Sequence, residues 1–255
     1  MKYDVGKGSD NMIAGLYDIF EHWHKQGTVW IYSDTHFGDL DLQDGVSSRP
    51  IDGIHLANIN SKVGKKDTII LLGDVGNVDM IRKMKGYKVL IAGNHDAGLS
   101  NYKREIHKRI FDAEKYTREE VLVEAKKLFP DCRYEINKGY QFHSPFEYWD
   151  LRADNRLFDE VYAGALVVGE KLILSHEPVD VPWAFNIHGH VHSGKPMSDN
   201  RHFNVCGEAR KCYEPVNLNQ FMKAGFMANI QTIHRDTIDK ATKRARKRGK
   251  KYGQK

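Results

Sequence analysis

Side chains that can bind a transition metal recur along this chain, each time directly after a short apolar run. In chain order they are Asp34, His36, Asp74, Asn94, His95, His176, His190 and His192. Imidazole, carboxylate and amide groups all serve as ligands of first-row divalent metals. A single histidine is more often structural than a ligand, but five such motifs in order favour a metal centre. The residue types therefore predict chemistry that depends on bound metal ions.

The spacing of the motifs supports a shared centre. In the D-x-H motif at 34–36 and the H-x-H motif at 190–192, alternation along an extended segment points both side chains to the same side. Gly73, Gly93 and Gly189 each directly precede a candidate ligand, and glycine lets the backbone turn sharply at such points. These local features predict that the motifs converge on one site.

Five apolar runs lead into these motifs and have the length and β-branched content of buried strands. They are Thr28–Ser33, Thr68–Leu72, Lys88–Ala92, Lys171–Leu174 and Phe185–Ile187. Open α/β sheets place their chemistry at the carboxyl ends of their strands. We therefore expect the polar motifs to meet at that edge, with helices between the strands.

Other segments predict further elements. Apolar residues at helical spacing indicate an N-terminal helix at about 11–25. Thr117–Phe129 carries a capping box and an apolar stripe, and Pro130 ends it. The further strand candidates are Tyr134–Ile136, Gln141–His143 and Val161–Val168, whereas Ser144–Asp159 shows no clear period.

The composition favours an ordinary globular protein. The chain has 255 residues, of which 40% are hydrophobic and 29% charged, which excludes a disordered, collagen-like or disulfide-stapled chain. No apolar run is long enough to span a bilayer, and the first ten residues hold no apolar signal core. We expect a cytoplasmic protein without membrane contact, whose Cys132, Cys206 and Cys212 are reduced thiols.

The basic residues are concentrated at the C-terminal end. Residues 240–255 contain nine lysines and arginines and no acid, while the rest of the chain holds 30 basic and 34 acidic residues. We expect one domain over 1–239 and a disordered basic tail over 240–255. The tail is either a solvated end or an arm that contacts nucleic acid without sequence preference.

Taken in order, the motifs D-x-H, GD, GNHD, H and GH-x-H over residues 34–192 resemble those of the calcineurin-like metallophosphoesterase superfamily. Phe203–Val205 followed by Tyr213–Leu218 is similar to the end of its small bacterial and phage phosphoesterases. The resemblance implies an α/β fold, a two-sheet β-sandwich flanked by helices with a dimetal site at the C-terminal ends of the strands. One departure is Gly73–Asn77, which reads GDVGN where the superfamily often has GDxxD.

The same resemblance implies two divalent metal ions, with manganese favoured and iron, zinc or nickel as alternatives. The implied ligands are Asp34, His36 and His192 for one metal, Asn94, His176 and His190 for the other, and Asp74 as the bridge between them. His95 would face the substrate phosphate as general acid, and Asp96 would either orient His95 or cap a helix. Weaker candidates for substrate contact are Arg49, Arg152, Arg156 and His188.

These expectations describe a hydrolase that cleaves a phosphoester through a metal-bridging hydroxide. The substrate stays open between a small phosphodiester or phosphomonoester, a nucleic acid and a nucleotide pyrophosphate. Gly38–Pro50 and Ser144–Asp159 are the segments expected to cap the site, with no long inserted domain between the motifs. The rivals are a non-catalytic scaffold, although all seven ligand positions and His95 are present, and a purely structural metal site, although such sites favour four cysteine or histidine ligands.

Overall fold

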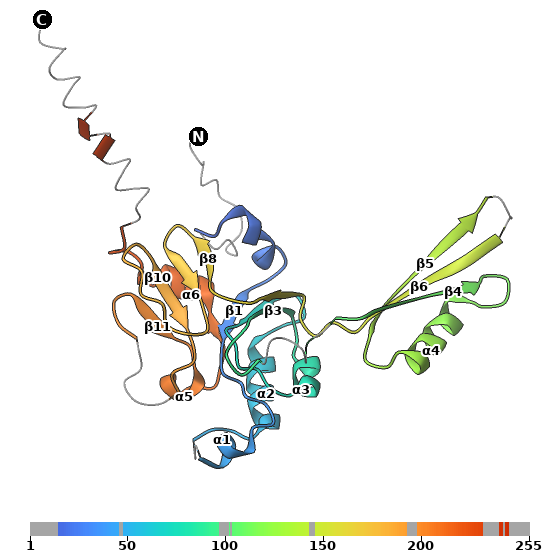
Figure 1. Ribbon diagram of the computed structural model, residues 1–255, viewed down its shortest axis with the longest axis horizontal. Coiled ribbons are helices and arrows are strands. Elements are labelled where there is room, and N and C mark those ends of the chain that lie inside the picture. The colour runs from blue at the N-terminus through green and yellow to red at the C-terminus, as the bar shows by residue number, and fades with distance from the viewer. Residues whose placement is uncertain are drawn as a thin grey trace, which may run out of the picture. The chain divides into compact units, whose positions relative to one another are not determined.

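The computed structural model describes residues 15–45, 48–96, 102, 104–142, 146–192, 198–231, 240–241 and 243–244 (Figure 1). The chain divides into two compact units, which we call unit 1 (residues 1–96 and 160–255) and unit 2 (residues 97–159). This differs from the single domain over 1–239 that the sequence predicts, and from the expectation of no long insertion between the motifs. Unit 2 is richer in charged residues than the rest of the chain, with 24 among 63 residues against 49 among the other 192.

Unit 1 contains two sheets. The first has the order β12-β1-β2-β3-β7, in which β1, β2, β3 and β7 run parallel and β12 is antiparallel to β1. Its strands are β1 (Val29–Tyr32), β2 (Thr68–Leu71), β3 (Tyr87–Ile91), β7 (Glu160–Tyr162) and β12 (Val216–Asn217). The three runs predicted in this sheet, at 28–33, 68–72 and 88–92, are confirmed as β1, β2 and β3.

The second sheet has the order β11-β10-β9-β8, with β9, β10 and β11 parallel and β8 antiparallel to β9. Its strands are β8 (Leu166–Gly169), β9 (Leu172–Leu174), β10 (Phe185–His188) and β11 (His202–Asn204). The predicted strands at 171–174 and 185–187 are confirmed. The single strand expected over Val161–Val168 is instead two, because β7 and β8 belong to different sheets.

The two sheets of unit 1 pack face to face around one apolar core. Residues of β1, β2 and β3 enter this core together with residues of β8, β9 and β10. Its strand members are Val29, Ile31, Ile70, Val89, Ile91, Val168, Leu172, Leu174, Phe185 and Ile187. The predicted α/β class, with sheets flanked by helices, is therefore what the structure shows.

Short helices lie between and after the strands of unit 1. They are η1 (Asp18–His24), α1 (Leu40–Gly45), α2 (Asp52–Lys62), α3 (Val78–Lys83), α5 (Gly207–Arg210) and α6 (Leu218–Lys223). On the face of the first sheet away from the core, the hydroxyl of Tyr32 in β1 lies 2.8 Å from Nε2 of His55 in α2. Asn77, the departure in the GD motif, caps α3 by accepting from the backbone of Asp79 and Met80.

The N-terminal helix is shorter than predicted and of a different type. Within the described part of 11–25 there is a seven-residue 3-10 helix, η1, while 11–14 lie outside the described residues. Leu16 instead forms an antiparallel bridge with Gly169, and Tyr17 donates its N–H to the carbonyl of Val168. Phe20 and Trp23 are buried three residues apart, which matches the 3-10 period as well as the α-helical one.

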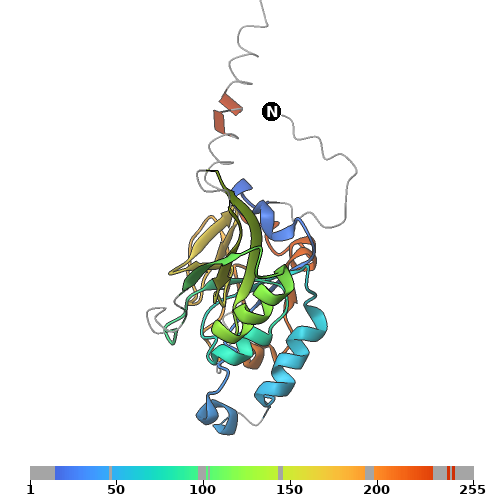
Figure 2. The ribbon, with the colours of Figure 1, turned by 90° about the vertical axis from the view of Figure 1, so that its right-hand side faces the viewer.

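Unit 2 is a three-stranded antiparallel sheet with one helix on it. The strands are β4 (Ile106–Asp112), β5 (Arg133–Gln141) and β6 (Phe146–Asp154), in the order β4-β6-β5, and the helix is α4 (Arg118–Leu128). Figure 2 shows α4 along one face of this sheet, where Val121 and Ala125 pack on Ile136 and Leu151. The predicted helix and its Thr117–Glu120 capping box are confirmed.

Two strands of unit 2 were not predicted. The segment without a clear period, 144–159, contains β6, and β4 had no sequence signal. Along the described chain, no helix has the length and apolar character needed to cross a membrane. Residues 245–255 of the predicted tail lie outside the described residues, and so do 143–145.

Candidate metal centre

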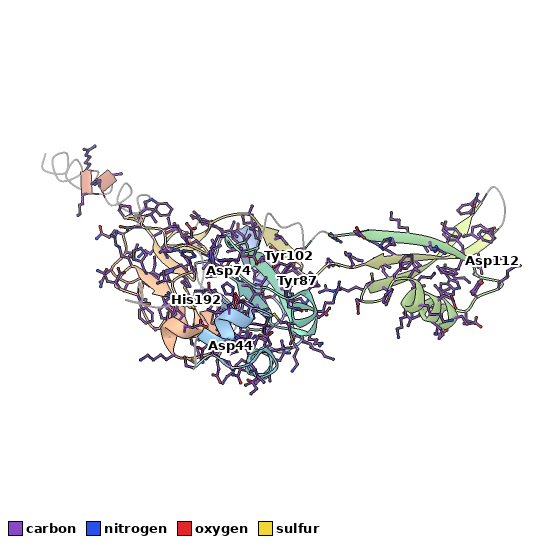
Figure 3. The ribbon with its side chains drawn as sticks, turned by 60° about the horizontal axis from the view of Figure 1, so that its bottom comes forward. Asp44, Asp74, Tyr87, Tyr102, Asp112 and His192 are labelled. Atoms are coloured by element: carbon purple, nitrogen blue, oxygen red, sulfur yellow. The ribbon has the colours of Figure 1, made fainter. Side chains whose placement is uncertain are left out.

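The candidate ligands lie where parallel strands end, in both sheets of unit 1. Asp34 and His36 follow β1, Asp74 follows β2, Asn94 and His95 follow β3, His176 follows β9, and His190 and His192 follow β10. A parallel bridge between Ser33 and Cys206 links the ends of β1 and β11 across the two sheets. Figure 3 labels Asp74 and His192, which come from different sheets. The sandwich thus brings both sets of strand ends to one place.

Asp74 lies between two groups of histidines. Its Oδ2 atom is 3.5 Å from Nε2 of His36 and 3.3 Å from Nε2 of His176. The two imidazoles come from different sheets and approach the same carboxylate oxygen. This is the position that the sequence predicted for a bridging residue, and the ligation itself stays a prediction.

The first group contains His176, Asn94 and His190. Nε2 of His176 lies 2.9 Å from Oδ1 of Asn94 and 3.1 Å from Nδ1 of His190, and those two atoms are 3.1 Å apart. Nδ1 of His176 lies 2.8 Å from the carbonyl oxygen of Leu72. Because a carbonyl only accepts, Nδ1 of His176 carries a proton, and Nε2 is the nitrogen that faces the other two ligands.

The second group contains Asp34, His36 and His192. Nε2 of His192 lies 3.4 Å from Oδ1 of Asp34, and the rings of His36 and His192 have centroids 5.0 Å apart. Nε2 of His36 is buried and has no hydrogen-bond partner among the described residues. Burying a polar atom without a partner is costly, and a cation near Asp74 would satisfy it. His190 and His192 fall in different groups, and their binding of different metals stays a prediction.

The backbone at the ligands is unusual. Asp34, His36, Asp74 and His190 all have positive φ, between 39° and 68°. Such conformations cost free energy in residues with a side chain, and they persist mainly at functional sites. Here they aim neighbouring polar groups inward, since the backbone N–H of His190 donates to both carboxylate oxygens of Asp34, at 3.1 and 3.0 Å.

The glycines before the ligands are required by close approach. A Cβ atom on Gly93 would lie 2.3 Å from Oδ1 of Asp74, and one on Gly189 would lie 2.4 Å from Oδ2 of Asp34. Real Cβ contacts are essentially never below 3.0 Å. The carboxylates therefore occupy space that any larger residue at these positions would fill.

His95 lies next to the two groups and in neither of them. Its side chain is exposed, its ring centroid is 5.3 Å from that of His36, and its backbone N–H donates to Oδ1 of Asp74 at 2.9 Å. The sequence placed His95 beside the ligands in this way. An exposed imidazole at the mouth of the site is able to exchange protons with a bound molecule.

Asp96 has a structural task that the sequence did not predict. Its buried carboxylate accepts from the backbone N–H groups of Gly93, Asp74 and Val75, at 2.7, 3.0 and 3.1 Å. These bonds hold the loops after β2 and β3 together. The residues that a helix cap at Asp96 would serve, 97–101, lie outside the described residues, so both helix capping and the orientation of His95 by Asp96 stay predictions.

The electrostatics of the site favour positive charge. Burial by itself would raise the pKa of Asp74, but the imidazoles of His176 and His36 and the N–H of His95 hold it well below its usual range. Burial would lower the pKa of His192, but hydrogen bonds to Asp34, Cys206 and Glu208 raise it to about 12. A site that keeps a proton on an imidazole so strongly is equally suited to a metal cation.

Cys206 and Glu208, which follow β11, belong to the site and were not predicted. Sγ of Cys206 is 3.7 Å from Nδ1 of His192 and donates to Oε2 of Glu208 at 2.9 Å. Burial raises the pKa of the Cys206 thiol to about 12. The signal that could have found them is the rule used for the other ligands, since Phe203–Val205 reads as a strand and a polar run follows it.

Two of the weak substrate candidates are wrong. Arg49, whose side chain is fully buried, pairs with Glu208 and donates to the carbonyls of Asp34 and Thr35. It cannot reach a substrate because every direction from its guanidinium is filled by protein. His188 is fully buried inside β10, with Nδ1 2.8 Å from the carbonyl of Gly189.

The other two weak candidates lie in unit 2. Arg152 is in β6, opposite Lys108 and Glu135. Arg156 pairs with Asp154 at 3.2 Å. All predicted metal ligands lie in unit 1, and a contact of these two arginines with substrate stays a prediction.

The ligand atoms fit a metal centre. Three sets of atoms each lie within 4.8 Å of one another: Asp34, His36 and Asp74; Asp74, His176 and His190; and Asp34, His192 and Cys206. The first two sets share Asp74, and the first and third share Asp34. Nitrogen and oxygen donors of this kind suit manganese, iron, zinc or nickel. The all-cysteine and histidine shell of a structural zinc site is a different arrangement.

Comparison with family models and with curated proteins finds no match. Among solved structures, the chain is similar to the protein of unknown function AQ665 from Aquifex aeolicus. The two are 18% identical, the match covers 77% of this chain and 98% of that chain, and the TM-score is 0.46. A likeness at this level carries no conclusion about activity.

Proposed function

We propose that this chain is a metal-dependent phosphoesterase with the two-sheet fold of the calcineurin-like superfamily. The observation that carries the proposal is the position of Asp74, one of whose oxygens lies within 3.5 Å of histidines from both groups. A carboxylate shared by two nitrogen-rich groups is suited to two neighbouring divalent cations. The order of motifs over residues 34–192 points to the same class.

The residues present would hold two metal ions, of which manganese is our first choice. Asp34, His36 and His192 would bind one, Asn94, His176 and His190 the other, and Asp74 both. When bound, two such ions supply a hydroxide of lowered pKa and polarise the phosphoryl oxygens of an ester.

The chain's own residues would supply orientation and a proton. His95 is the exposed imidazole at the mouth of the site, and we assign it the transfer of a proton to the departing oxygen of the substrate. Asp96 ties the loop that carries His95 to the loop after β2, because its carboxylate accepts from the N–H of Gly93 in the first loop and from those of Asp74 and Val75 in the second. The Nδ1–H of His176 is committed to Leu72, which leaves its other nitrogen for a ligand role.

The substrate class we favour is a small phosphodiester or phosphomonoester. A nuclease is the second candidate because nine lysines and arginines without an acid occupy residues 240–255 and would neutralise phosphates of a polymer. A nucleotide pyrophosphate is the third, with no particular observation in its favour.

A paired hydrolysis assay tests the proposal. The full chain is stripped of metal with a chelator, loaded with Mn²⁺ and offered bis-p-nitrophenyl phosphate and p-nitrophenyl phosphate. We expect about two metals per chain by elemental analysis and turnover that the chelator abolishes. His95→Ala should keep the metals and lose turnover, whereas His107→Ala, a histidine of unit 2, should behave as wild type.

The outcomes separate the candidates. Preference for the diester leads to single- and double-stranded nucleic acids as the next substrates, with a variant truncated at residue 239 to test the tail. Preference for the monoester favours a phosphatase. No turnover of either ester by a chain that holds two metals would contradict the proposal and favour a scaffold of the same fold.

A further inference from the structure

The imidazole of His192 stands between two carboxylates. Its Nε2 lies 3.4 Å from Oδ1 of Asp34, and its Nδ1 lies 3.4 Å from Oε2 of Glu208. The atoms of His36 and Asp74 gather with Asp34 on the Nε2 side. On the other side of the ring, among the described residues, Nδ1 lies near Glu208 and Cys206. The ring therefore points one nitrogen, Nε2, at the ligand groups and the other, Nδ1, at a supporting carboxylate.

Glu208 is held firmly in this position. Its side chain is 6% exposed, and it forms an ion pair with Arg49, whose side chain is fully buried. The thiol of Cys206 donates to the same Oε2 atom that faces His192. Arg49 also donates to the carbonyl oxygens of Asp34 and Thr35. Arg49 thus joins Glu208 to the loop that carries the Asp34 ligand.

We propose that Glu208 is a positioning residue for the metal centre, which accepts the Nδ1–H of His192 and so keeps Nε2 directed at Asp34. Arg49 is its buried counter-ion. The inference rests on the proposed metal-dependent function. A carboxylate accepts and never donates when ionised, so a proton on Nδ1 is the arrangement this pair selects. Partners of this kind fix the tautomer and ring orientation of a metal-binding histidine.

Cys206 offers the competing assignment. A metal bound by Asp34, His192 and Cys206 would lie on the Nδ1 side and would need the thiol as thiolate. The geometry favours Nε2 because the thiol already donates to Glu208, and because His36 and Asp74 lie with Asp34 on the other side. The two assignments place a bound metal on opposite nitrogens of one ring, so spectroscopy can tell them apart.

The test compares metal affinity in the full chain by competition with a chelator, using Zn²⁺ and Co²⁺ as probes. Wild type, Glu208→Gln and Glu208→Ala are measured with Glu160→Gln, a control at another largely buried carboxylate of unit 1 that also contacts a histidine. We expect Glu208→Ala to lose about 10–100-fold in affinity for one of two metal equivalents, the range usual for such partners. Glu208→Gln should lose less, because its amide oxygen still accepts from Nδ1.

A second variant guards against misfolding. Glu208→Ala leaves the buried Arg49 without its counter-ion, which is destabilising. The double variant Arg49→Met with Glu208→Leu removes both charges, and replacing a buried pair by apolar residues is often tolerated. It should unfold in the metal-free state at a temperature close to that of wild type and still bind the same metal equivalent weakly. A purely structural role would restore the affinity along with the stability.

Two spectroscopic readouts complete the test. In the Zn²⁺-loaded wild type with ¹⁵N-labelled histidine, the NMR spectrum should show the signal of a protonated Nδ1 in His192. That signal should be absent from Glu208→Ala. The Co²⁺-loaded chain should show no sulfur-to-cobalt charge-transfer band. Such a band, or equal affinities of wild type and the Glu208 variants, would overturn the inference. A wild type that binds neither ion would instead refute the proposed function, and the inference would fall with it.

Discussion

Replacing Gly189 with alanine should displace Asp34 and impair the metal centre while unit 1 stays folded. The added Cβ would lie 2.4 Å from Oδ2 of Asp34 and 2.4 Å from Oγ of Ser33. The carboxylate must therefore withdraw by at least about 0.6 Å to reach the 3.0 Å limit, and by about 1 Å to reach ordinary contact at 3.4 Å. The φ of Gly189 lies outside the positive range, so steric contact alone is the perturbation.

The size of the effect follows from that displacement. A misplacement of about 1 Å at a catalytic site can cost about 10²-fold in rate. Overpacking of this kind costs roughly 1–3 kcal/mol of stability, which a domain of ordinary stability survives. We therefore expect turnover of bis-p-nitrophenyl phosphate to fall about 100-fold or more, with weaker binding of the metal that Asp34 would hold.

The assay pairs Gly189→Ala with Gly53→Ala as a matched control. Gly53 lies in α2, where an added Cβ would meet nothing within 4 Å, so alanine there should stabilise the chain slightly. Metal content, chelator competition and turnover are measured on both variants, with thermal unfolding as a check. If Gly189→Ala binds metal and turns over like wild type, Asp34 is not a ligand in the position described here.

Three further predictions concern His95, His55 and Leu151. His95→Ala should retain both metals and lose about 10²–10⁴-fold in turnover of an ester with a poor leaving group, measured by steady-state kinetics. Burial, assisted by Arg49, lowers the pKa of His55 to about 4. Below pH 6.5 the unfolded chain therefore binds a proton at His55 that the folded chain does not, so the free energy of unfolding falls as the pH is lowered towards 4. That amounts to about 3 kcal/mol, and urea unfolding of chelator-treated protein should show less pH dependence in His55→Gln than in wild type. Leu151→Ala should cost about 2–5 kcal/mol in unit 2, seen by calorimetry or proteolysis, because this leucine is fully buried against α4; a loss below 1 kcal/mol would contradict that packing.

The strands and their polar ends could be predicted because their signals are local. Each of the five expected strands is a short apolar run followed within two residues by an aspartate, asparagine or histidine. Parallel strands then bring those ends to one edge without any further information. Asp74 lies near His36 and His176 for the same reason, and its role as a bridge between two metals stays a prediction.

Unit 2 could not be predicted as a separate unit. Its strand β6 packs Leu151 and Trp149 against α4, while the residues that alternate with them include both charged and aromatic side chains. This mixture hides the alternation that normally identifies a strand. The capping box of Thr117 and Glu120, in contrast, depends on residues three positions apart and was found.

Arg49 shows most clearly what a single sequence withholds. Its polar surroundings in the sequence indicate a phosphate contact, but in the fold it forms a buried ion pair with Glu208, 159 positions away along the chain. A buried ion pair of that separation leaves no spacing to recognise. The same is true of the contact between Glu208 and His192.

The sequence motifs specify the ligand positions but not the residues that orient His192. All seven predicted ligands lie between residues 34 and 192, and each is set by its own strand end. The groups that orient His192 come later, after β11, and reach it only because β11 lies parallel to β10. A chain could therefore contain every motif of the centre and still leave the imidazole of His192 without a fixed orientation. The identity of the residues after β11 should accordingly matter for metal affinity as much as the motifs themselves.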